Sequence, residues 1–390
     1  MLSHHGRSMI GGAPLADLAL AQALRDEGHE VDDYFFEDVL PRAVRGTWRL
    51  LLFPWAVALA FLRGHRQRRW DVVESTAGDA WIISLLLRLL RGPRPLLSIR
   101  THGLEHRRVD IDRERRCREG ASPGLVTRLY HYHYRLWEVG RDLRSADAVF
   151  LLNREDELYA ASRLGLQQQA VHIVPNGLRN EVLSLADPDG SADRVFRLLF
   201  LGLWSPIKGA DLLPLIARRL FEKDSRFRLT CAGVQRREEA VLADFAPEDR
   251  DRVDVVVRYE GAELPSLLAR HGVFVFPSPV EGCSLALLEA MAGGLAPVTV
   301  RTGYAREIVQ PGLNGFLIEA NDIEGFIDCI LALAADPAAA LAMGRAARQA
   351  VSGHRWTDRA RERVRIWDST IREGASSARI TNDTCDVGHK

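Results

Sequence analysis

Residues 274–294 read FVFPSPVEGCSLALLEAMAGG, and this stretch contains the pattern that decides the fold. Its apolar start predicts a buried β-strand, and the segment from Ser284 onward predicts an α-helix. Glu281 and Gly282 lie in the loop between them, and Glu289 lies on the helix, eight positions after Glu281. Because the first turn of a helix has unpaired N–H groups at its positive end, the loop is suited to bind an anion between two carboxylates. The alternative is that both glutamates are solvated or only complement the helix dipole.

The same alternation of short apolar runs and helical patterns extends along the chain in both directions. It predicts doubly wound parallel sheets, which bind ligands outside the carboxyl ends of their strands. A polar, turn-rich stretch interrupts the alternation, and 390 residues suit two domains of roughly 100–200 residues each. We therefore expect two α/β domains. The expected boundaries are a first domain at 1–186, a linker at 187–195, a second domain at 196–354, a closing helix at 355–373 that packs back toward the first domain, and a disordered tail at 374–390.

The composition excludes one class of partner. The chain has 52 basic and 52 acidic side chains, so its formal net charge is zero, whereas proteins that coat nucleic acid need a basic surplus. Its five cysteines lie far apart, without the close spacing of a zinc site or a redox pair, which predicts reduced thiols. The N-terminal stretch lacks the apolar core of a signal peptide. We expect a cytoplasmic protein.

Arginine-rich segments occur at two places in the first domain. The longest apolar run, Leu50–Leu62, is interrupted by Pro54, is shorter than the roughly 20 residues of a membrane-spanning helix, and has arginines on both sides. It could dock at the inner face of a membrane, on anionic lipid; the alternative, which we favour, is a buried helix. Residues 107–119 are rich in both charges, which predicts a solvated or mobile loop, with a border of the acceptor site as the alternative.

The two glutamates of the opening stretch, followed by Ala290-Met-Ala, resemble the E-x7-E motif of the retaining glycosyltransferases of family 4. Further segments follow the order and spacing of that family's motifs. They are Gly11-Gly12, Arg25–Val31, Thr101-His-Gly103, Ala146–Val149, Val174–Gly177, Gly202 with Lys208-Gly209, and Pro311–Phe316. The resemblance covers most of the chain and implies the GT-B fold, with two Rossmann-like, doubly wound domains and a central cleft.

The resemblance implies a metal-independent, retaining glycosyltransferase of the hexosyltransferase type. Such an enzyme moves a sugar from a nucleotide diphosphate donor, held by the second domain, to a hydroxyl of a carbohydrate, lipid-linked or small-molecule acceptor held by the first. No cofactor and no metal are expected. Three aspartate pairs spaced as D-x-D do not follow apolar strands, so we interpret them as solvated loop charges and not as metal ligands. They are Asp110 with Asp112, Asp187 with Asp189, and Asp249 with Asp251.

The resemblance also implies roles for single residues. Glu289 would bind ribose hydroxyls, Glu281 would face the donor sugar, and Lys208 would contact the diphosphate. His102 would lie beside the reacting sugar, and Tyr259 beside the base. The implied catalytic residues are therefore His102, Lys208 and Glu281. The implied donor-binding residues are Gly12, Lys208, Glu281, Gly282, Cys283, Ser284, Leu285, Glu289 and Tyr259.

One position departs from the family. Many members carry an arginine shortly before the Lys-Gly pair, but residues 202–208 contain none. Either Lys208 acts without it, or a residue elsewhere replaces it, for instance Arg301 or Arg306. His4 and His5 match no motif and receive no role. Three other functions stay open: a nucleotide-sugar epimerase of the same fold, a non-catalytic two-domain sugar-binding protein, and a membrane-anchored assembly factor.

Overall fold

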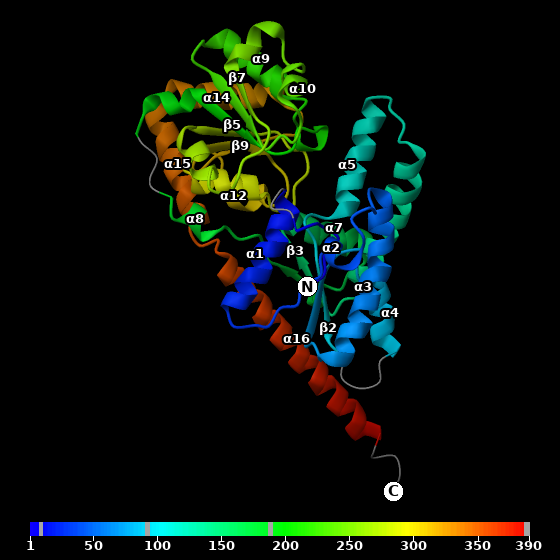
Figure 1. The fold of residues 1–390 in the computed structure, drawn as a ribbon. Helices are drawn as coiled ribbons and strands as arrows, with labels where there is room; N and C mark the ends of the chain where they lie inside the picture. Colours follow the sequence, from blue (N-terminus) through cyan, green and yellow to red (C-terminus); the bar gives the residue numbers. More distant parts are fainter. Residues whose placement is uncertain (8–10, 90–93, 186–189, 386–390) are drawn as a thin grey trace. The chain divides into compact units, whose positions relative to one another are not determined.

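The computed structural model describes residues 1–390 except 8–10, 90–93, 186–189 and 386–390, and for residues 374–385 it describes the backbone alone (Figure 1). The chain forms two compact units. Unit 1 is Met1–Pro175 together with Trp356–Lys390, and unit 2 is Asn176–Arg355.

Unit 1 is built on a parallel sheet with the strand order β1-β2-β3-β4. The strands are β1 (Val72–Thr76), β2 (Leu96–Arg100), β3 (Ala148–Leu151) and β4 (Val171–Ile173). The helices are α1 (Gly12–Asp26), α2 (Phe36–Val39), α3 (Thr47–Gln67), α4 (Trp81–Leu89), α5 (Glu105–Arg118), η1 (Thr127–Tyr134), α6 (Arg135–Ser145), α7 (Arg154–Leu164), η2 (Gln168–Ala170) and α16 (Trp356–Cys385). Strands β2 and β3 are buried along their whole length, as in parallel sheets whose two faces are both covered.

A very short strand precedes α1. Leu2 is bridged in parallel to Ser75 of β1 on one side and to Tyr34 on the other. Leu2 N donates to Glu74 O at 2.8 Å, and Tyr34 N donates to Met1 O at 2.9 Å. Leu2 therefore extends the sheet beyond β1, although the apolar run around it is too short to predict a strand from the sequence.

Helix α3 is buried on one face and exposed on the other. The prediction of a buried helix for Leu50–Leu62 is therefore wrong for the exposed face. The inner face packs into the core of unit 1 through Phe53, Val57 and Phe61, and α3 packs against α2 and α4. The opposite face exposes large apolar side chains. They are Trp48, Leu52, Trp55, Leu59 and Leu62.

Unit 2 is built on a parallel sheet of six strands in the order β10-β9-β8-β5-β6-β7. The strands are β5 (Arg197–Leu201), β6 (Arg228–Ala232), β7 (Val253–Val256), β8 (Val273–Phe276), β9 (Ala296–Val300) and β10 (Phe316–Ile318). The helices are α8 (Asn180–Leu183), η3 (Ala192–Phe196), η4 (Pro206–Lys208), α9 (Leu213–Lys223), α10 (Glu238–Leu242), η5 (Pro247–Arg252), α11 (Leu264–Ala269), α12 (Leu285–Ala292), α13 (Ala305–Ile308), α14 (Ile323–Ala335) and α15 (Pro337–Val351). The strand order reverses between β5 and β8, which pair directly. Ligands of doubly wound sheets bind at this switch point, beyond the carboxyl ends of the strands.

Two predictions of solvated loops are wrong. Residues 107–119 lie almost wholly in helix α5, where Asp112 pairs with Arg115 at 2.9 Å and opposite charges three and four positions apart stabilise the helix. Asp249 is buried in η5, where it lies 4.0 Å from Arg252. We predicted loops from the mixture of acidic and basic residues. In the structure, these opposite charges form ion pairs within helices instead.

The boundary between the two units comes before the expected linker at 187–195. Residues from Asn176 onward belong to unit 2, and Asn176 Nδ2 donates to Cys283 O at 2.8 Å, which ties this segment to the loop after β8. The first part of the expected linker, with Asp187 and Asp189, lies outside the described residues.

Helix α16 is the expected closing helix, but it is longer than the predicted range 355–373. Its backbone continues to Cys385, past the expected start of the tail at 374, while 386–390 lie outside the described residues. No proline interrupts the helix, and a single glycine costs a helix only about 1 kcal/mol.

Buried polar contacts hold α16 in unit 1. The helix packs against α1 and β3. Arg363 forms an ion pair with Glu74 of β1, and both side chains are buried. Trp367 Nε1 donates to Ser98 Oγ of β2 at 3.0 Å. The C-terminal helix is therefore part of the core of the unit that contains the N-terminus.

Within the described residues, no single helix has the length and the apolar composition to cross a membrane. Helices α14 and α15 meet that test only as a pair, joined across a bend of 110°. Helix α3, which contains the longest apolar run, does not meet it.

Replacing Trp367 by alanine should destabilise unit 1 by about 3–5 kcal/mol, because it opens a large cavity and leaves Ser98 without its partner. Urea unfolding followed by far-UV circular dichroism measures the change. Ile371→Ala is the matched control, because that side chain lies on the same helix but is 41% exposed, and it should change the stability little. A loss of less than about 1 kcal/mol for Trp367→Ala would contradict the packing of α16 described above.

Candidate functional site

The loops after β5 and β8 bring two predicted site residues together. Lys208 ends the short helix η4 after β5, and Glu281 lies in the loop after β8. Lys208 Nζ lies 2.6 Å from Glu281 Oε1, and Ser278 Oγ donates to the same oxygen at 2.7 Å. The Lys208 side chain is still 29% exposed, so a ligand can reach it. The ammonium group therefore has a defined position and can exchange its carboxylate partner for another anion.

Two glycines allow the neighbouring backbone to approach this ion pair. Gly209 has a φ of +70°, and a Cβ there would lie 2.2 Å from the backbone oxygen of Pro277. Gly303 has a φ of +52°, and a Cβ there would lie 2.0 Å from the backbone oxygen of Glu281. No other residue fits these positions without a shift of the backbone. This close approach explains why a glycine follows Lys208 in the sequence. It also makes Gly303 part of the site, although the sequence predicted no role for it.

The other predicted residues of the loop lead into helix α12. The Ser284 side chain accepts a hydrogen bond from Leu287 N at 3.3 Å and so caps the helix, whose first residue is Leu285. The carbonyl oxygens of Gly282 and Cys283 each accept a hydrogen bond at 2.8 Å from a residue outside the loop. The loop is thus held in one conformation, with the positive end of the α12 dipole beside it.

Glu289 lies on α12 and is buried, with 8% of its surface exposed. Burial raises the pKa of its carboxyl to about 7, although the guanidinium of Arg179, with Nη2 4.0 Å from Oε1, lowers that pKa in part. Burial and the charge of Glu289 both raise the pKa of the Tyr259 phenol, so the two predicted residues lie in one region. The Glu289 carboxyl is therefore poised to change its charge near neutral pH.

Arg179 is a site residue that the sequence analysis missed. It lies two positions after the motif segment Val174–Gly177, and that closeness was the signal that could have indicated it. Its guanidinium also packs against Gly261, where a Cβ would lie 2.4 Å from Nη1. Arg301, one of the two predicted substitutes for the missing arginine, has its Nε 3.0 Å from Glu319 Oε1. Arg179 is thus an arginine of unit 2 that the fold places beside the Glu289 carboxylate.

In unit 1, the predicted residue His102 contacts a buried aspartate of α1. His102 Nε2 lies 2.9 Å from Asp17 Oδ1. The same carboxylate accepts hydrogen bonds from Ser3 Oγ at 2.7 Å and Arg100 Nε at 2.9 Å, and His5 Nδ1 lies 3.1 Å away. Burial raises the pKa of Asp17, but Arg100 and His102 outweigh it and hold that pKa well below its usual range. No motif of the sequence indicated Asp17 or His5.

The atoms of this cluster have the spacing of a metal site. Ligand atoms of His5, Asp17 and His102 lie within 4.8 Å of one another. The Arg100 guanidinium, however, is bound to the same carboxylate and would repel a cation at short range. The arrangement fits an aspartate that orients two imidazole rings better than it fits a metal centre.

Gly12 and His4 also lie in unit 1. Gly12 opens α1, and a Cβ there would meet no described atom within 4 Å, so its backbone is accessible. His4 Nδ1 lies 2.8 Å from Asp79 Oδ2, and burial lowers the pKa of His4. The predicted site residues thus divide between the units, with His102 and Gly12 in unit 1 and the others in unit 2.

Unit 2 matches a family of known proteins. Residues 195–336 match the family model described as Glycosyl transferases group 1. A D-inositol 3-phosphate glycosyltransferase of Kribbella flavida is 29% identical over 233 residues, which are 55% of this chain and 54% of that protein. The chain therefore spans about half the length of this curated relative.

Solved structures show the same fold. The sucrose-phosphate synthase of Thermosynechococcus elongatus matches with a TM-score of 0.75 and 19% identity, over 95% of this chain and 98% of that chain. The HepE protein of Anabaena in complex with UDP matches with a TM-score of 0.70 and 16% identity, over 94% and 98%. The likeness confirms the predicted α/β fold class, with two Rossmann-like domains as in GT-B glycosyltransferases. Together with the match of residues 195–336 to the family model, it confirms the resemblance of this chain to glycosyltransferases.

Proposed function

We propose that the chain transfers a sugar from a nucleotide diphosphate donor to an acceptor hydroxyl, and that unit 2 binds the donor. The observation that carries this proposal is the contact between Lys208 and Glu281 at the switch point of the sheet. There a cation, a carboxylate and the N-terminus of α12 lie where doubly wound sheets bind phosphate-containing ligands. The UDP complex of the Anabaena structure supports a nucleotide diphosphate as the ligand.

Each residue of this site has a part in donor binding. When the donor binds, the Lys208 ammonium releases the Glu281 carboxylate and donates hydrogen bonds to oxygens of the diphosphate. A charge-assisted hydrogen bond of this kind contributes about 1.5–3 kcal/mol to the binding free energy. Glu281, once released, accepts hydrogen bonds from hydroxyls of the donor sugar. The ionised Glu289 carboxylate accepts hydrogen bonds from the ribose hydroxyls, and Tyr259 lies beside the base.

The chemical step needs positive charge where the diphosphate leaves. The bond between the sugar carbon and the diphosphate oxygen breaks, the acceptor oxygen bonds to that carbon with retention, and the acceptor proton passes to the departing diphosphate. Lys208 and the α12 terminus stabilise the charge that develops on that group. Because these groups supply the charge, the proposal includes no metal ion.

Transfer is better supported than the alternatives. The relative from Kribbella flavida is named a glycosyltransferase and the Thermosynechococcus elongatus protein a synthase, which supports transfer over epimerisation or binding without catalysis. Product analysis separates these cases. A transferase releases the nucleoside diphosphate and forms a glycoside, whereas an epimerase converts the nucleotide sugar without such release.

Replacing Lys208 or Glu289 by alanine should weaken donor binding by at least about tenfold, or about 1.4 kcal/mol, because each substitution removes a hydrogen bond to a charged group. Isothermal titration measures the affinity for the nucleotide sugar that raises the melting temperature most in a thermal-shift panel. Lys223→Ala, at an exposed lysine of α9, is the matched control and should bind the donor like the unmodified protein. Control-like affinity in both site variants would refute the assignment of the site.

Donor affinity should rise as the pH increases from about 6 to about 8, because the Glu289 pKa of about 7 makes the carboxylate the major form only above that pH. The phosphates of a nucleotide sugar do not titrate in this range, so the donor adds no pH dependence of its own. Glu289→Gln should abolish the rise, and Arg179→Gln should move its midpoint to higher pH. Titrations across this range test the account, which a flat profile for the unmodified protein would contradict.

Activity should survive chelation of divalent ions, because Lys208 and α12 supply the positive charge. Release of nucleoside diphosphate from the donor, followed with and without EDTA, measures this. Equal rates are expected in both conditions. A loss with EDTA that manganese restores would show that the reaction needs a metal ion.

A further inference from the structure

A row of exposed apolar side chains runs along helix α3. Its members, called the α3 stripe below, range from 36% exposed at Leu62 to 66% exposed at Trp48. The α3 stripe consists of Trp48, Leu52, Trp55, Leu59 and Leu62. At 3.6 residues per turn, steps of four and three positions place all of them on one face of the helix. Single exposed apolar residues are ordinary, but a continuous row marks a surface that contacts something other than water.

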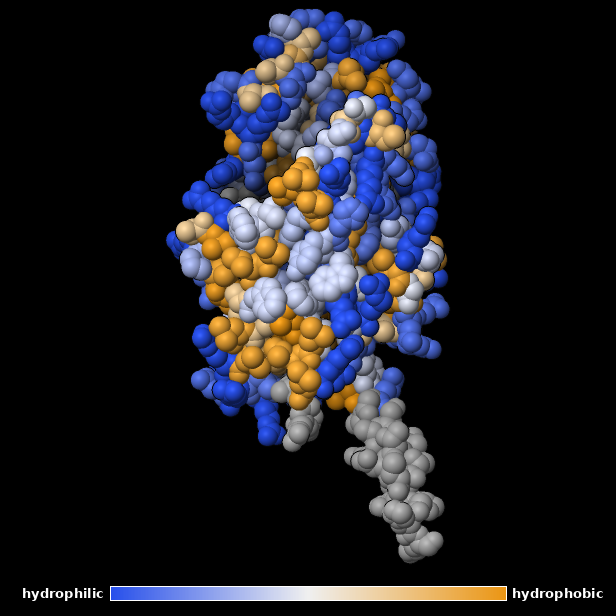
Figure 2. Space-filling view, turned by 90° about the vertical axis from the view of Figure 1, so that its right-hand side faces the viewer, coloured by the Kyte–Doolittle hydropathy of each residue, from blue (hydrophilic) through white to orange (hydrophobic). Residues whose placement is uncertain are grey.

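Neighbouring helices widen this apolar surface. Helix α4 packs against α3 and exposes Leu85 and Leu89, the latter to 78%. The Trp55 ring lies 5.7 Å from that of Trp81, which in turn lies 5.3 Å from the half-exposed ring of Trp137. Figure 2 shows apolar side chains gathered on the face of the molecule to which α3 and α4 belong.

Arginines dominate the sequence on both sides of the α3 stripe. Residues 39–70 contain seven arginines and neither aspartate nor glutamate. Arg66 lies on α3 four positions after the α3 stripe and continues its helical spacing, and Arg45 lies just before the helix begins. Arg45, Arg63 and Arg66 are exposed, and in the described part of the chain none of the three has an ion-pair partner. Among the described residues, exposed arginines outside any ion pair therefore lie at both ends of the apolar row.

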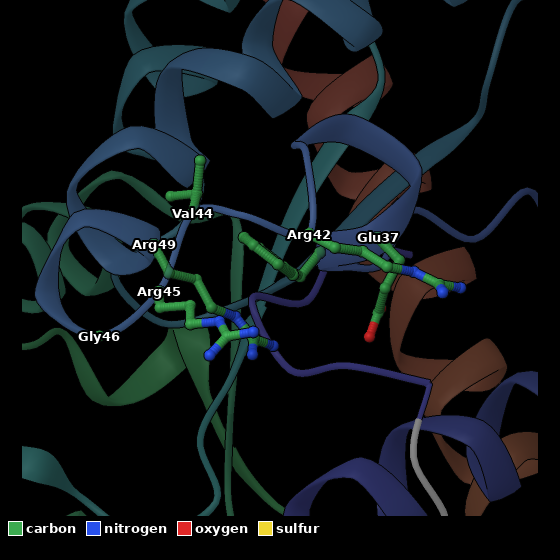
Figure 3. Close-up of a pocket in the computed structure, with 7 residues that line it drawn as sticks. Glu37, Arg42, Val44, Arg45, Gly46 and Arg49 are labelled. Carbon is green, nitrogen blue, oxygen red and sulfur yellow. The ribbon is translucent and has the colours of Figure 1, made fainter.

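A basic pocket adjoins the N-terminal end of the α3 stripe. It has a volume of about 330 Å³, and Arg42, Arg45 and Arg49 line it together with Glu37. Figure 3 shows the guanidinium groups of Arg45 and Arg49 beside each other. Arg49 Nε donates to the backbone oxygen of His4 at 2.9 Å, so its position is fixed by the fold. Two adjacent guanidinium groups in a pocket suit a phosphate group.

We propose that the α3 stripe and the arginines at its ends dock unit 1 on an anionic lipid bilayer, with α3 lying in the plane of the interface. The apolar row fits the boundary between headgroups and acyl chains, and the arginines fit the phosphates of anionic lipids. A purely apolar protein partner would leave these arginines without counter-charges. The proposal is independent of the donor chemistry of unit 2.

Flotation of the full chain with lipid vesicles tests the apolar part of the proposal. The protein should bind vesicles of equal parts phosphatidylcholine and phosphatidylglycerol, and the variant Trp48→Ser, Leu52→Ser, Leu59→Ser should lower the partition coefficient to less than about a tenth. The control variant replaces exposed leucines outside the α3 stripe, Leu158→Ser, Leu215→Ser and Leu313→Ser, and should bind like the unmodified protein. Thermal melting of each variant shows whether it is folded.

A second pair of variants tests the charges. Arg63→Gln with Arg66→Gln should lower the partition coefficient about tenfold, whereas Arg237→Gln with Arg345→Gln, at exposed arginines of unit 2, should leave it unchanged. Salt should weaken binding of the unmodified protein, because it screens exposed charges. This test stays valid if the apolar variant does not fold.

Three results would overturn the proposal. They are absence of binding to the anionic vesicles, equal binding to vesicles of phosphatidylcholine alone, and equal losses in the site and control variants. A chain that self-associates in solution, and that becomes monomeric in the apolar variant without ever binding vesicles, would show that the α3 stripe contacts a second copy of this protein instead.

Discussion

The ion pair between Lys208 and Glu281 joins the loops after β5 and β8, the two strands between which the sheet of unit 2 reverses its order. The surrounding geometry depends on this close approach. Gly209 and Gly303 are needed because any Cβ at these positions would collide with the backbone of the β8 loop. The loop then leads directly into α12, so one short segment supplies a carboxylate, a helix terminus and, farther along the helix, Glu289. In the proposed complex, the diphosphate contacts the helix terminus, the donor sugar contacts Glu281 and the ribose contacts Glu289.

A second constraint governs unit 1. Asp17 is fully buried, and a buried carboxylate is costly unless several donors surround it. Ser3, Arg100 and the imidazoles of His5 and His102 meet that need, and they come from two separate parts of the chain, the N-terminal segment and the end of β2. Because the carboxylate has few arrangements that satisfy all these groups, it fixes the ring of His102. Placement of this histidine therefore depends on the N-terminal segment and on helix α1, which carries Asp17.

The sequence predicted the parts of the site that depend on local order. Lys208 follows a strand and is one of three lysines in the chain, and Glu281 stands between a recognisable strand and a helix. Asp17 could not be predicted, because its partner Arg100 lies 83 positions away and no periodicity connects the two. The one-sided burial of Leu50–Leu62 was hidden for a similar reason, since a run that is apolar all round does not show which face the fold will cover. Both fold units could be predicted because alternating strands and helices are local patterns.

The central claim is that a nucleotide diphosphate sugar binds across the loops after β5 and β8 of unit 2. Amide hydrogen exchange, measured with and without the donor that stabilises the protein most, tests it directly. The account predicts slower exchange in residues 203–210 and 278–289 when the donor is bound. Saturation with the donor that leaves exchange in both segments unchanged would contradict it.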